Sequence, residues 1–474
     1  MPTETPDRPN VLFVLTDQQR PEWVGMTDVP VRTPNLSALA ERGTWFRNAV
    51  SPSPVCAPGR ACLASGMRYE DCGVALGDDF PPERETYYRR LREEAGYHVM
   101  GCGKFDLHKG TMHWGTDGGY RVEEWGFSEA VDNAGKIATH KTGRDPVDPY
   151  MTHLEDRGLA ELHVEDYRWR LARDNYAATF PTPLPEDAYA DNWIARQGLS
   201  LLDDAPADRP WHLVVNFTGP HEPMDVTDRM HTLYRDPPVE FPGPVHDDDG
   251  PETDTKPRDF DAGTHQAIRR NYAAMIENVD RWLGRYLDEL EARGELENTL
   301  VVVSADHGEM LGDYGLWTKQ APHQPSVGVP MVVAGPGVRS RGAVETPTSL
   351  LDVHATLLEY AGLDTGDVDS RSMRPFLEGR SETHRDVVRS GLGPWRLAFD
   401  GQYKLLTGYD HDVGARNQVG AFVEGGGDLT ERAREHARAL DPVLYDLAVG
   451  EHVNVADEHP GVVDRLSEHL PTVG

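Results

Sequence analysis

The sequence contains few lysines, few cysteines and no long apolar run. Lysine accounts for 7 of the 474 residues, so arginine supplies 40 of the 47 basic side chains. The 4 cysteines are too few for a disulfide framework, and none has the Cys-x-x-Cys spacing of a zinc site. No stretch approaches the roughly 18 apolar residues of a transmembrane helix, and the polar start predicts no cleavable signal peptide. These absences predict a cytoplasmic protein that does not enter a membrane.

The chain is strongly acidic, with a formal net charge of -32. Because the field of such a protein repels other polyanions, nucleic acids and anionic membranes are not expected as partners. An acidic, lysine-poor surface is typical of proteins from very salty cytoplasm, where salt screens the self-repulsion. The alternative is a GC-rich genome that favours arginine codons. In either case, a local cluster of cations would indicate a site for an anionic ligand.

Buried strands alternate with helices in the first three quarters of the chain. Residues 10–17 (NVLFVLTD) form a short apolar run typical of a strand buried on both faces, and residues 213–217, 299–304 and 331–334 repeat it. Helices are predicted from residue 35 to 42 and, from apolar side chains at 3.6-residue spacing, from 272 to 290. Residues from the 140s to 180 and from 237 to 263 look like surface insertions. The pattern predicts an α/β fold with a large, mainly parallel sheet.

The last ninety residues have a different sequence pattern. Residues 396–406 (RLAFDGQYKLL) predict two strands joined by an Asp-Gly turn, residues 443–447 another strand, and residues 460–470 a closing helix. We therefore expect a catalytic α/β domain over residues 1–385 and a small C-terminal α+β subdomain over residues 386–474.

Two of the predicted strands end in metal-binding residue types. Asp17-Gln18 follows the first strand and Asp306-His307 follows the strand over 299–304. In open parallel sheets ligands gather at the carboxyl ends of the strands. Carboxylate and amide oxygens suit Ca²⁺, Mg²⁺ or Mn²⁺. A lone Asp at a strand end is more often a turn residue, but two such pairs at matching ends favour a cation site.

Cys56 lies in a conformationally restricted segment, residues 51–60 (SPSPVCAPGR). Its prolines and glycine hold the backbone in a non-helical path, and a helix could begin near Pro58. A cysteine at a helix N-terminus with Arg60 four residues on is in an environment that favours anions and an activated thiol. A buried loop cysteine is the alternative, and it is the expected state of Cys62, Cys72 and Cys102.

Residues 56–60 (CAPGR) resemble the Cys-x-Pro-x-Arg signature of the formylglycine-dependent sulfatases. Other segments are similar to that family in the same order: RPNVLFVLTDQQR, SADHGEMLGDYGLWTK and LYDLAVGEHVNVADEHP. The Asp-Gln pair resembles choline-sulfatase and phosphonate-monoester-hydrolase relatives. The likeness covers nearly the whole chain. It implies an alkaline phosphatase-like fold, in which helices sandwich the sheet.

The resemblance also implies a mechanism and its residues. Cys56 would be converted to formylglycine by a formylglycine-generating enzyme and would attack the sulfur of a small sulfate ester with the help of a divalent metal, most simply Ca²⁺. Arg60 would orient the attacking group, Lys104 and Lys319 would contact the sulfate, and His221 would act as general acid. The implied metal ligands are Asp17, Gln18, Asp306, His307 and residue 56.

The sequence departs from the family at three places. Gly59 stands where the signature usually has Ser. The family's Gly-Lys-Trp-His-Leu-Gly element reads GKFDLHKG, so Asp106 replaces a histidine, and His108 is the candidate to take its place. In KQAPHQPSVGVP the family's common Phe, Glu and Arg are replaced, and we expect His323 to face the substrate pocket.

Two other functions fit the same sequence. The nucleophile and metal would also suit a phosphonate monoester or a phosphodiester, and the sequence does not separate these from a sulfate ester. An inactive binding protein that keeps the fold is a third possibility, but it predicts lost ligands, and the metal-binding and signature residues are all present. The physiological substrate and the oligomeric state do not follow from the sequence.

Overall fold

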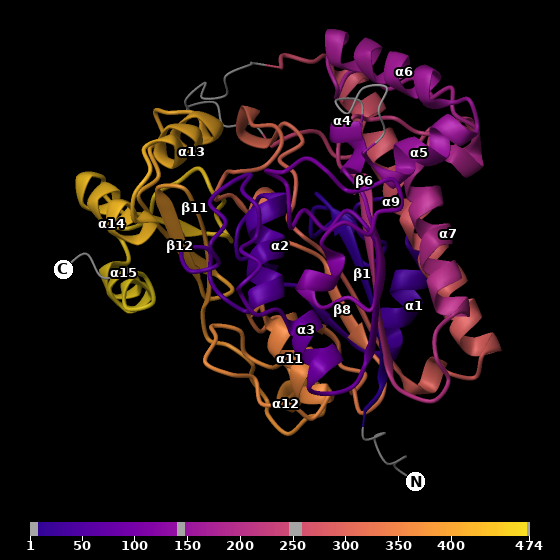
Figure 1. The fold of residues 1–474 in the computed structure, drawn as a ribbon. Coiled ribbons are helices and arrows are strands. Elements are labelled where there is room, and N and C mark those ends of the chain that lie inside the picture. The colour runs from indigo at the N-terminus through magenta and orange to yellow at the C-terminus, as the bar shows by residue number, and fades with distance from the viewer. Residues whose placement is uncertain (1–7, 140–146, 246–257, 472–474) are drawn as a thin grey trace.

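An eight-stranded sheet runs through the centre of the computed structural model, which describes residues 8–139, 147–245 and 258–471 (Figure 1). The strand order is β5-β4-β6-β1-β7-β8-β2-β9. The strands are β1 (Asn10–Asp17), β2 (Thr44–Phe46), β4 (His98–Gly103), β5 (Glu129–Asp132), β6 (Trp211–Pro220), β7 (Thr299–Ala305), β8 (Met331–Ala334) and β9 (Gly342–Val344). All neighbouring pairs are parallel except those that β8 makes with β7 and β2. The predicted α/β class with a mainly parallel sheet is confirmed.

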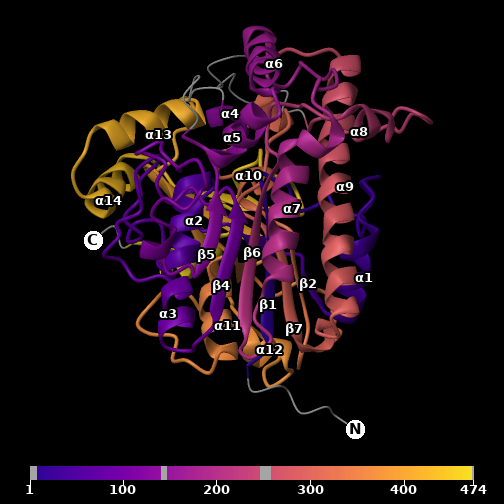
Figure 2. The same ribbon diagram turned by 45° about the vertical axis from the view of Figure 1, so that its right-hand side comes forward.

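Helices cover both faces of this sheet because its central strands are apolar on both faces. In β1, Val11, Phe13 and Leu15 belong to one hydrophobic core, and Leu12 and Val14 to another. The first core is covered by α2 (Cys56–Ser65), α3 (Tyr87–Glu93), α11 (Asp352–Tyr360) and α12 (Arg374–Leu377). The second is covered by α1 (Pro34–Arg42), α7 (Ala190–Asp203) and α9 (Ala262–Ala292). Figure 2 shows α7 and α9 along the right-hand side of the sheet, with α1 next to α9.

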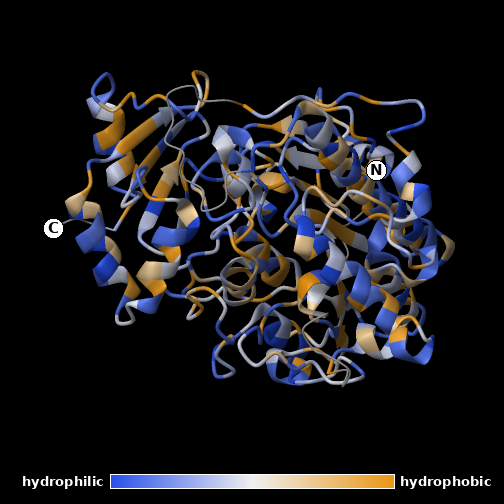
Figure 3. Cartoon of the chain, turned by 90° about the horizontal axis from the view of Figure 1, so that it is seen from above, coloured by the Kyte–Doolittle hydropathy of each residue, from blue (hydrophilic) through white to orange (hydrophobic). Residues whose placement is uncertain are grey.

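The longest helix, α9, contains the predicted amphipathic segment 272–290. Its N-terminus is capped by Asp261, whose carboxylate accepts a hydrogen bond from the backbone N–H of Thr264 at 2.7 Å. The helix carries hydrophobic and hydrophilic residues on different sides, as do other peripheral helices in Figure 3. Within the described ranges, no helix combines the length and apolar character needed to cross a bilayer.

The segment from the 140s to 180 is more ordered than the sequence suggested. It forms α5 (Pro149–Asp156) and α6 (Ala160–Arg173), and Asp148 caps α5 by accepting from Met151 N at 2.9 Å. The predicted loop over 237–263 is free of helix and strand up to residue 245, and residues 140–146 and 246–257 lie outside the described ranges. The shorter elements are β3 (Ala49–Val50), β10 (Thr348–Ser349), α4 (Gly135–Thr139), α8 (Asp228–Thr232), α10 (Gln324–Val327), η1 (Val122–Trp125), η2 (Glu186–Ala188), η3 (Leu296–Asn298) and η4 (Asp313–Gly315).

A second, antiparallel sheet follows in the order β11-β12-β13-β14. Its strands are β11 (Val388–Leu392), β12 (Trp395–Phe399), β13 (Tyr403–Thr407) and β14 (Val443–Asp446), accompanied by α13 (Ala415–Glu424), α14 (Leu429–Ala439) and α15 (Pro460–Ser467). The predicted Asp-Gly hairpin, third strand and closing helix are confirmed, whereas β11, α13 and α14 were not predicted. Trp395 and Leu397 share a core with the main sheet. The division at residue 385 therefore separates two sheets that share a core, and as a domain boundary it stays a prediction.

Candidate metal and catalytic site

Four neighbouring strands bring polar side chains to one edge of the main sheet. The strands β4, β6, β1 and β7 lie side by side and are followed by Lys104, His221, Gln18 and Asp306 respectively, with Asp17 the last residue of β1. In the parallel pair of β1 and β7, Thr16 is in register with Ala305, so Asp17 and Asp306 leave the sheet next to each other. The sequence-based expectation that the two acid pairs meet is therefore met in the structure.

A glycine allows the end of β4 to approach β6 closely enough to place Lys104. Gly103 has a φ of +100°, and a Cβ there would lie 1.9 Å from the carbonyl oxygen of Asn216 on β6. Any other residue would push the two strands apart. The same carbonyl accepts a hydrogen bond from Lys104 N at 3.1 Å, which fixes the start of the following loop.

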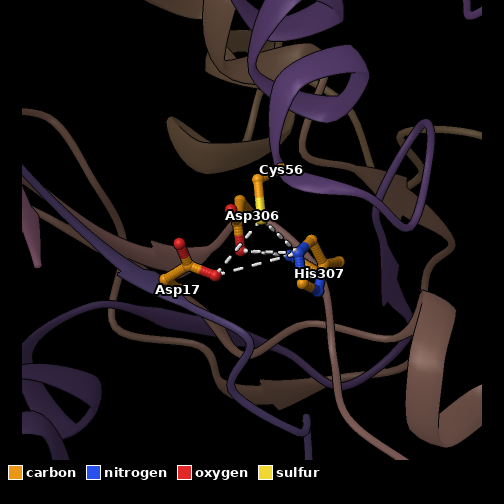
Figure 4. Close-up of side chains that lie close together, drawn as sticks. All are labelled: Asp17, Cys56, Asp306 and His307. Carbon is orange, nitrogen blue, oxygen red and sulfur yellow. Dashed lines mark hydrogen bonds and ion pairs between the residues drawn. The ribbon is translucent and has the colours of Figure 1, made fainter. Parts of the chain in front are cut away.

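Four side chains with metal-ligating atoms converge at this edge (Figure 4). One atom each from Asp17, Cys56, Asp306 and His307 lies within 4.8 Å of all the others, and all four residues are buried. The Cys56 Sγ is 3.2 Å from His307 Nε2 and 3.5 Å from Asp17 Oδ1. His307 Nε2 is 3.6 Å from Asp306 Oδ1 and 3.8 Å from Asp17 Oδ1.

Cys56 is the first residue of α2, a helix whose residues are all buried. The expected helix start near Pro58 thus lies two residues earlier, and no side chain caps the helix N-terminus. Its backbone N–H groups and dipole favour negative charge at this end. Gly59, the departure from the family signature, has a physical reason, because a Cβ there would lie 2.8 Å from the Ser53 carbonyl oxygen.

Arg60 contacts both carboxylates of the four-residue group and compensates their charge. Its Nε donates to Asp306 Oδ2 at 2.9 Å, and its Nη2 is 3.6 Å from Asp17 Oδ2. Its Nη1 donates to the backbone carbonyl of Lys104. The buried Nη2 makes no hydrogen bond among the described residues, so it has a donor to spare for a further oxygen at this site.

Lysines complete the site on the cavity side. Lys104 Nζ forms an ion pair with Asp17 and lies 3.1 Å from Asp106 Oδ2. Lys319 Nζ donates to Gln18 Oε1 at 2.7 Å and lies 3.2 Å from Cys56 Sγ. Both lysines, together with Cys56, line a cavity of about 270 Å³. Cationic side chains therefore line this cavity in a chain that is acidic as a whole.

The electrostatics of the site favour an anionic group at position 56. Burial and the Asp17 carboxylate raise the pKa of the Cys56 thiol, but Lys104, Lys319 and His307 outweigh them, and the net pKa lies well below the ordinary value. Burial also raises the pKa of Asp17, and Lys104 in particular overcomes it, so this carboxyl titrates well below its usual range. An anion or an electron-rich group is therefore stabilised at this position.

The same residues fit a divalent cation. Two buried carboxylates, an imidazole nitrogen and residue 56 offer a compact set of oxygen and nitrogen donors. His307 Nδ1 lies 2.9 Å from the Gly308 carbonyl oxygen. With the proton on Nδ1 donated to this carbonyl, Nε2 is free to act as a metal ligand. Burial lowers the pKa of His307, but Asp306 raises it above the ordinary value, so a proton and a cation would compete for the group.

A sequence model of the family described as Sulfatase matches residues 9–363. The chain belongs to the sulfatase family. It is accordingly a sulfuric ester hydrolase, as the sequence predicted. The sulfatase is 30% identical to a choline-sulfatase of Rhizobium meliloti (strain 1021), over 80% of this chain and 73% of that protein. It is 25% identical to an arylsulfatase of Clostridium perfringens (strain 13 / Type A), over 85% of each chain.

Solved structures agree with this fold. The crystal structure of a phosphonate monoester hydrolase of Agrobacterium radiobacter superposes with a TM-score of 0.72, covers 98% of this sulfatase and 94% of its own chain, and is 21% identical. At that identity the likeness supports the fold alone. The predicted alkaline phosphatase-like architecture is confirmed.

Asp106, not His108, occupies the cavity of the sulfatase. Asp106 contacts Lys104 and lines the cavity, whereas the His108 ring stacks on Trp125 and lies near Trp114. Burial lowers the pKa of His108 to about 4, so the ring is neutral. The expectation that His108 takes over the missing histidine is therefore corrected: its side chain packs in an aromatic cluster away from the lining.

His323 is likewise not brought to the cavity. Its ring packs against Tyr314, Tyr409 and Tyr445, with the Tyr314 centroid at 5.0 Å. Burial lowers its pKa to about 4. The residue packs between the loop that carries Tyr314 and the C-terminal part of the chain, and it does not line the cavity. His221 does line the cavity, and its Nδ1 lies 3.1 Å from Glu222 Oε2.

The structure adds acidic and basic residues that the sequence reasoning missed. Glu222 and Glu309 both accept from the Gln18 amide nitrogen, and Glu309 also accepts from Tyr176 OH at 2.7 Å. These contacts hold the Gln18 amide nitrogen, and its oxygen accepts from Lys319 Nζ on the other side. Two more lysines, Lys109 and Lys136, line the cavity. The scarcity of lysine in the sequence could have indicated Lys109 and Lys136, because four of the seven lysines line this cavity.

Proposed function

We propose that this chain hydrolyses a sulfate monoester of a small molecule through formylglycine made from Cys56. The observation that carries the proposal is the position of Cys56. Its sulfur lies at the N-terminus of a buried helix, 3.2 Å from Lys319 Nζ and 3.2 Å from His307 Nε2. A group at this position faces the cavity and has cations on several sides. Maturation would require a formylglycine-generating enzyme as a transient partner.

Asp17, Gln18, Asp306 and His307 would hold a divalent cation beside residue 56. Oxygen donors predominate in this set, which suits Ca²⁺, while Mg²⁺ and Mn²⁺ take the same ligand types. When bound, such a cation supplies positive charge that makes an oxygen nucleophilic at neutral pH. The ion pair of Lys104 with Asp17 favours the ionised form of that carboxylate, and the ion pair of Arg60 with Asp306 holds the second carboxylate in place to receive the cation.

The cationic side chains of the cavity would bind and polarise the sulfate. Lys104 approaches the site from the end of β4 and Lys319 from the loop after η4, so together they can contact separate sulfate oxygens. Such preorganised charges are most effective where negative charge builds up in the transition state. His221 lies in the lining with its Nδ1 near Glu222, so its other ring nitrogen can deliver a proton to the leaving alcohol.

A phosphonate monoester or phosphodiester is the alternative substrate class. The structural likeness to a phosphonate monoester hydrolase favours keeping this candidate, since the same fold and donor types serve that reaction class. Discrimination requires rates, because both substrates present an anionic tetrahedral centre to the same lysines.

The deciding experiment compares turnover of 4-nitrophenyl sulfate with that of 4-nitrophenyl phenylphosphonate by protein loaded with Ca²⁺. We expect kcat/KM to be higher for the sulfate and to fall by at least about 10⁴-fold in Cys56→Ala. Conversion of the thiol to an aldehyde lowers the mass of the peptide containing residue 56 by about 18 Da, and activity should track the converted fraction. A Cys56→Ala variant as fast as the parent would refute the proposal, and a higher rate on the phosphonate would favour the alternative.

A further inference from the structure

Lys109 lies at the outer part of the cavity, apart from the lysines next to Cys56. Its side chain is 29% exposed, compared with 6% for Lys104 and 1% for Lys136. It follows Lys104 by five residues, in the segment that departs from the family's usual sequence. The cavity lining therefore includes a solvent-accessible cation as well as buried ones.

The charge of Lys109 is only partly compensated. Its Nζ lies 2.8 Å from Asp106 Oδ1, while the other oxygen of the same carboxylate lies 3.1 Å from Lys104 Nζ. One carboxylate is thus shared by two ammonium groups, and Arg60 also acts on it. Lys136, in contrast, has the Asp225 carboxylate at 2.8 Å. Lys319, the other half-buried lysine of the lining, is held next to Cys56 and Gln18, so Lys109 is the half-buried lysine apart from Cys56 that can accept a second anionic partner.

The cavity lining that contains Lys109 also has an apolar part. Leu76, Met112 and Ile137 line the same cavity and are each half-buried. Among the described lining residues there is no Phe, Tyr or Trp. A quaternary ammonium group is usually held by aromatic faces, and the lining offers only carboxylates that lysines already occupy. The cavity is therefore suited to an apolar body that carries a negative charge, and poorly suited to a cationic leaving group.

We infer that the substrate is a sulfate ester whose apolar leaving group carries a second anionic group, such as a carboxylate, bound by Lys109. The inference rests on the proposed function for the position of the sulfate. It assigns Lys109 as the residue that selects the charge of the leaving group. The alternative role for Lys109 is purely structural, namely the neutralisation of Asp106.

The test compares 4-carboxyphenyl sulfate with its uncharged isostere, 4-carbamoylphenyl sulfate, on calcium-loaded protein. We expect the ratio of kcat/KM for the carboxylate to that for the carboxamide to fall by about fivefold to twentyfold in Lys109→Gln, mainly through KM. The ratio should be retained in Lys109→Arg. A surface control, Arg42→Gln, removes a positive charge that is paired with Glu297 far from the cavity, and should leave the ratio unchanged.

Each outcome decides the inference. A structural role would lower both rates by one factor and leave the ratio unmoved in Lys109→Gln, which would overturn it. A parent protein that hydrolyses neither ester would instead count against the proposed function. Calorimetric binding of 4-sulfobenzoate and 4-carbamoylbenzenesulfonate, which cannot be hydrolysed, then still tests Lys109. We expect tighter binding of the carboxylate by the parent and loss of that preference in Lys109→Gln, and equal binding by the parent would overturn the inference.

Discussion

Replacement of Lys319 by methionine removes one cation from the catalytic cavity and keeps most of the side chain's volume. In the parent, Lys319 Nζ donates to Gln18 Oε1 at 2.7 Å and lies 3.2 Å from Cys56 Sγ. Lys319 is half-buried and lies in a loop, so its side chain does not support the hydrophobic core. Its removal should therefore impair the reaction much more than the fold.

The expected magnitude follows from these contacts. Two unit charges 4 Å apart interact by about 4 kcal/mol at an effective dielectric constant near 20. Loss of one preorganised donor to a developing charge in other enzymes costs about 3 kcal/mol, or roughly 10²–10³ in kcat. We expect a loss of that size for Lys319→Met. The hydrogen bond to Gln18 is worth about 1 kcal/mol of stability, so the free energy of unfolding should change by no more than that.

The assay measures kcat and KM for 4-nitrophenyl sulfate together with urea unfolding of the same preparations. Arg42→Met is the matched control, because it removes a positive charge from an exposed ion pair with Glu297. The control should keep parental rates. A loss below tenfold in folded Lys319→Met protein would refute the assignment of Lys319 as a sulfate-binding cation. A large loss of stability would show instead that its role is structural.

Three further predictions follow from other parts of the structure. Chelation with EDTA should abolish turnover and leave the protein folded, because Arg60 and Lys104 already compensate the carboxylates. Added Ca²⁺ should restore activity. Unfolding on chelation would contradict this explanation. Glu309→Gln removes a carboxylate that orients the Gln18 amide, so the Ca²⁺ concentration for half-maximal activity should rise about 10- to 100-fold, and an unchanged value would exclude that role. Burial raises the pKa of Asp352, but Arg385 and then His384 outweigh burial and hold this pKa well below its usual range. The substitution Asp352→Asn should therefore lower the free energy of unfolding, measured in urea at pH 7, by about 3 kcal/mol. The depressed pKa means that this stabilisation is present above about pH 4 and is lost as the pH falls, so parent and variant should converge in acid, and a constant difference would refute the ion-pair explanation.

The central part of the site could be predicted because it depends on strand order alone. Buried parallel strands have apolar runs, and the residues that end them must meet at one sheet edge. Asp17 and Asp306 could therefore be placed together from the sequence, and the segment around Cys56 supplied the third partner. The fold class followed from the same runs, since alternation of strand and helix leaves few architectures.

The errors arose where side-chain direction depends on local backbone or on distant contacts. Asp106 has a φ of +56°, a left-handed conformation that short polar residues tolerate, and it redirects the chain so that His108 turns into the aromatic cluster. His323 packs on Tyr445 of β14 and on Tyr409, which follows β13. Neither effect is visible in residue spacing.

The helices of the 149–173 region were missed for a different reason. α6 has few buried residues and carries charged side chains around most of its surface, so its apolar periodicity is weak. The exposed Trp169 adds an aromatic residue on the outer side, which further blurs the pattern. Tertiary contacts with α5 and the loop after it stabilise a helix that the sequence alone does not indicate.

The most direct test is a crystal structure of active protein grown with Ca²⁺. The account predicts one ion between Asp17, Asp306 and His307, with an oxygen of the modified side chain 56 at about 2.3–2.6 Å from it. An ion bound elsewhere, or a residue 56 that is an unmodified cysteine in fully active protein, would contradict the account.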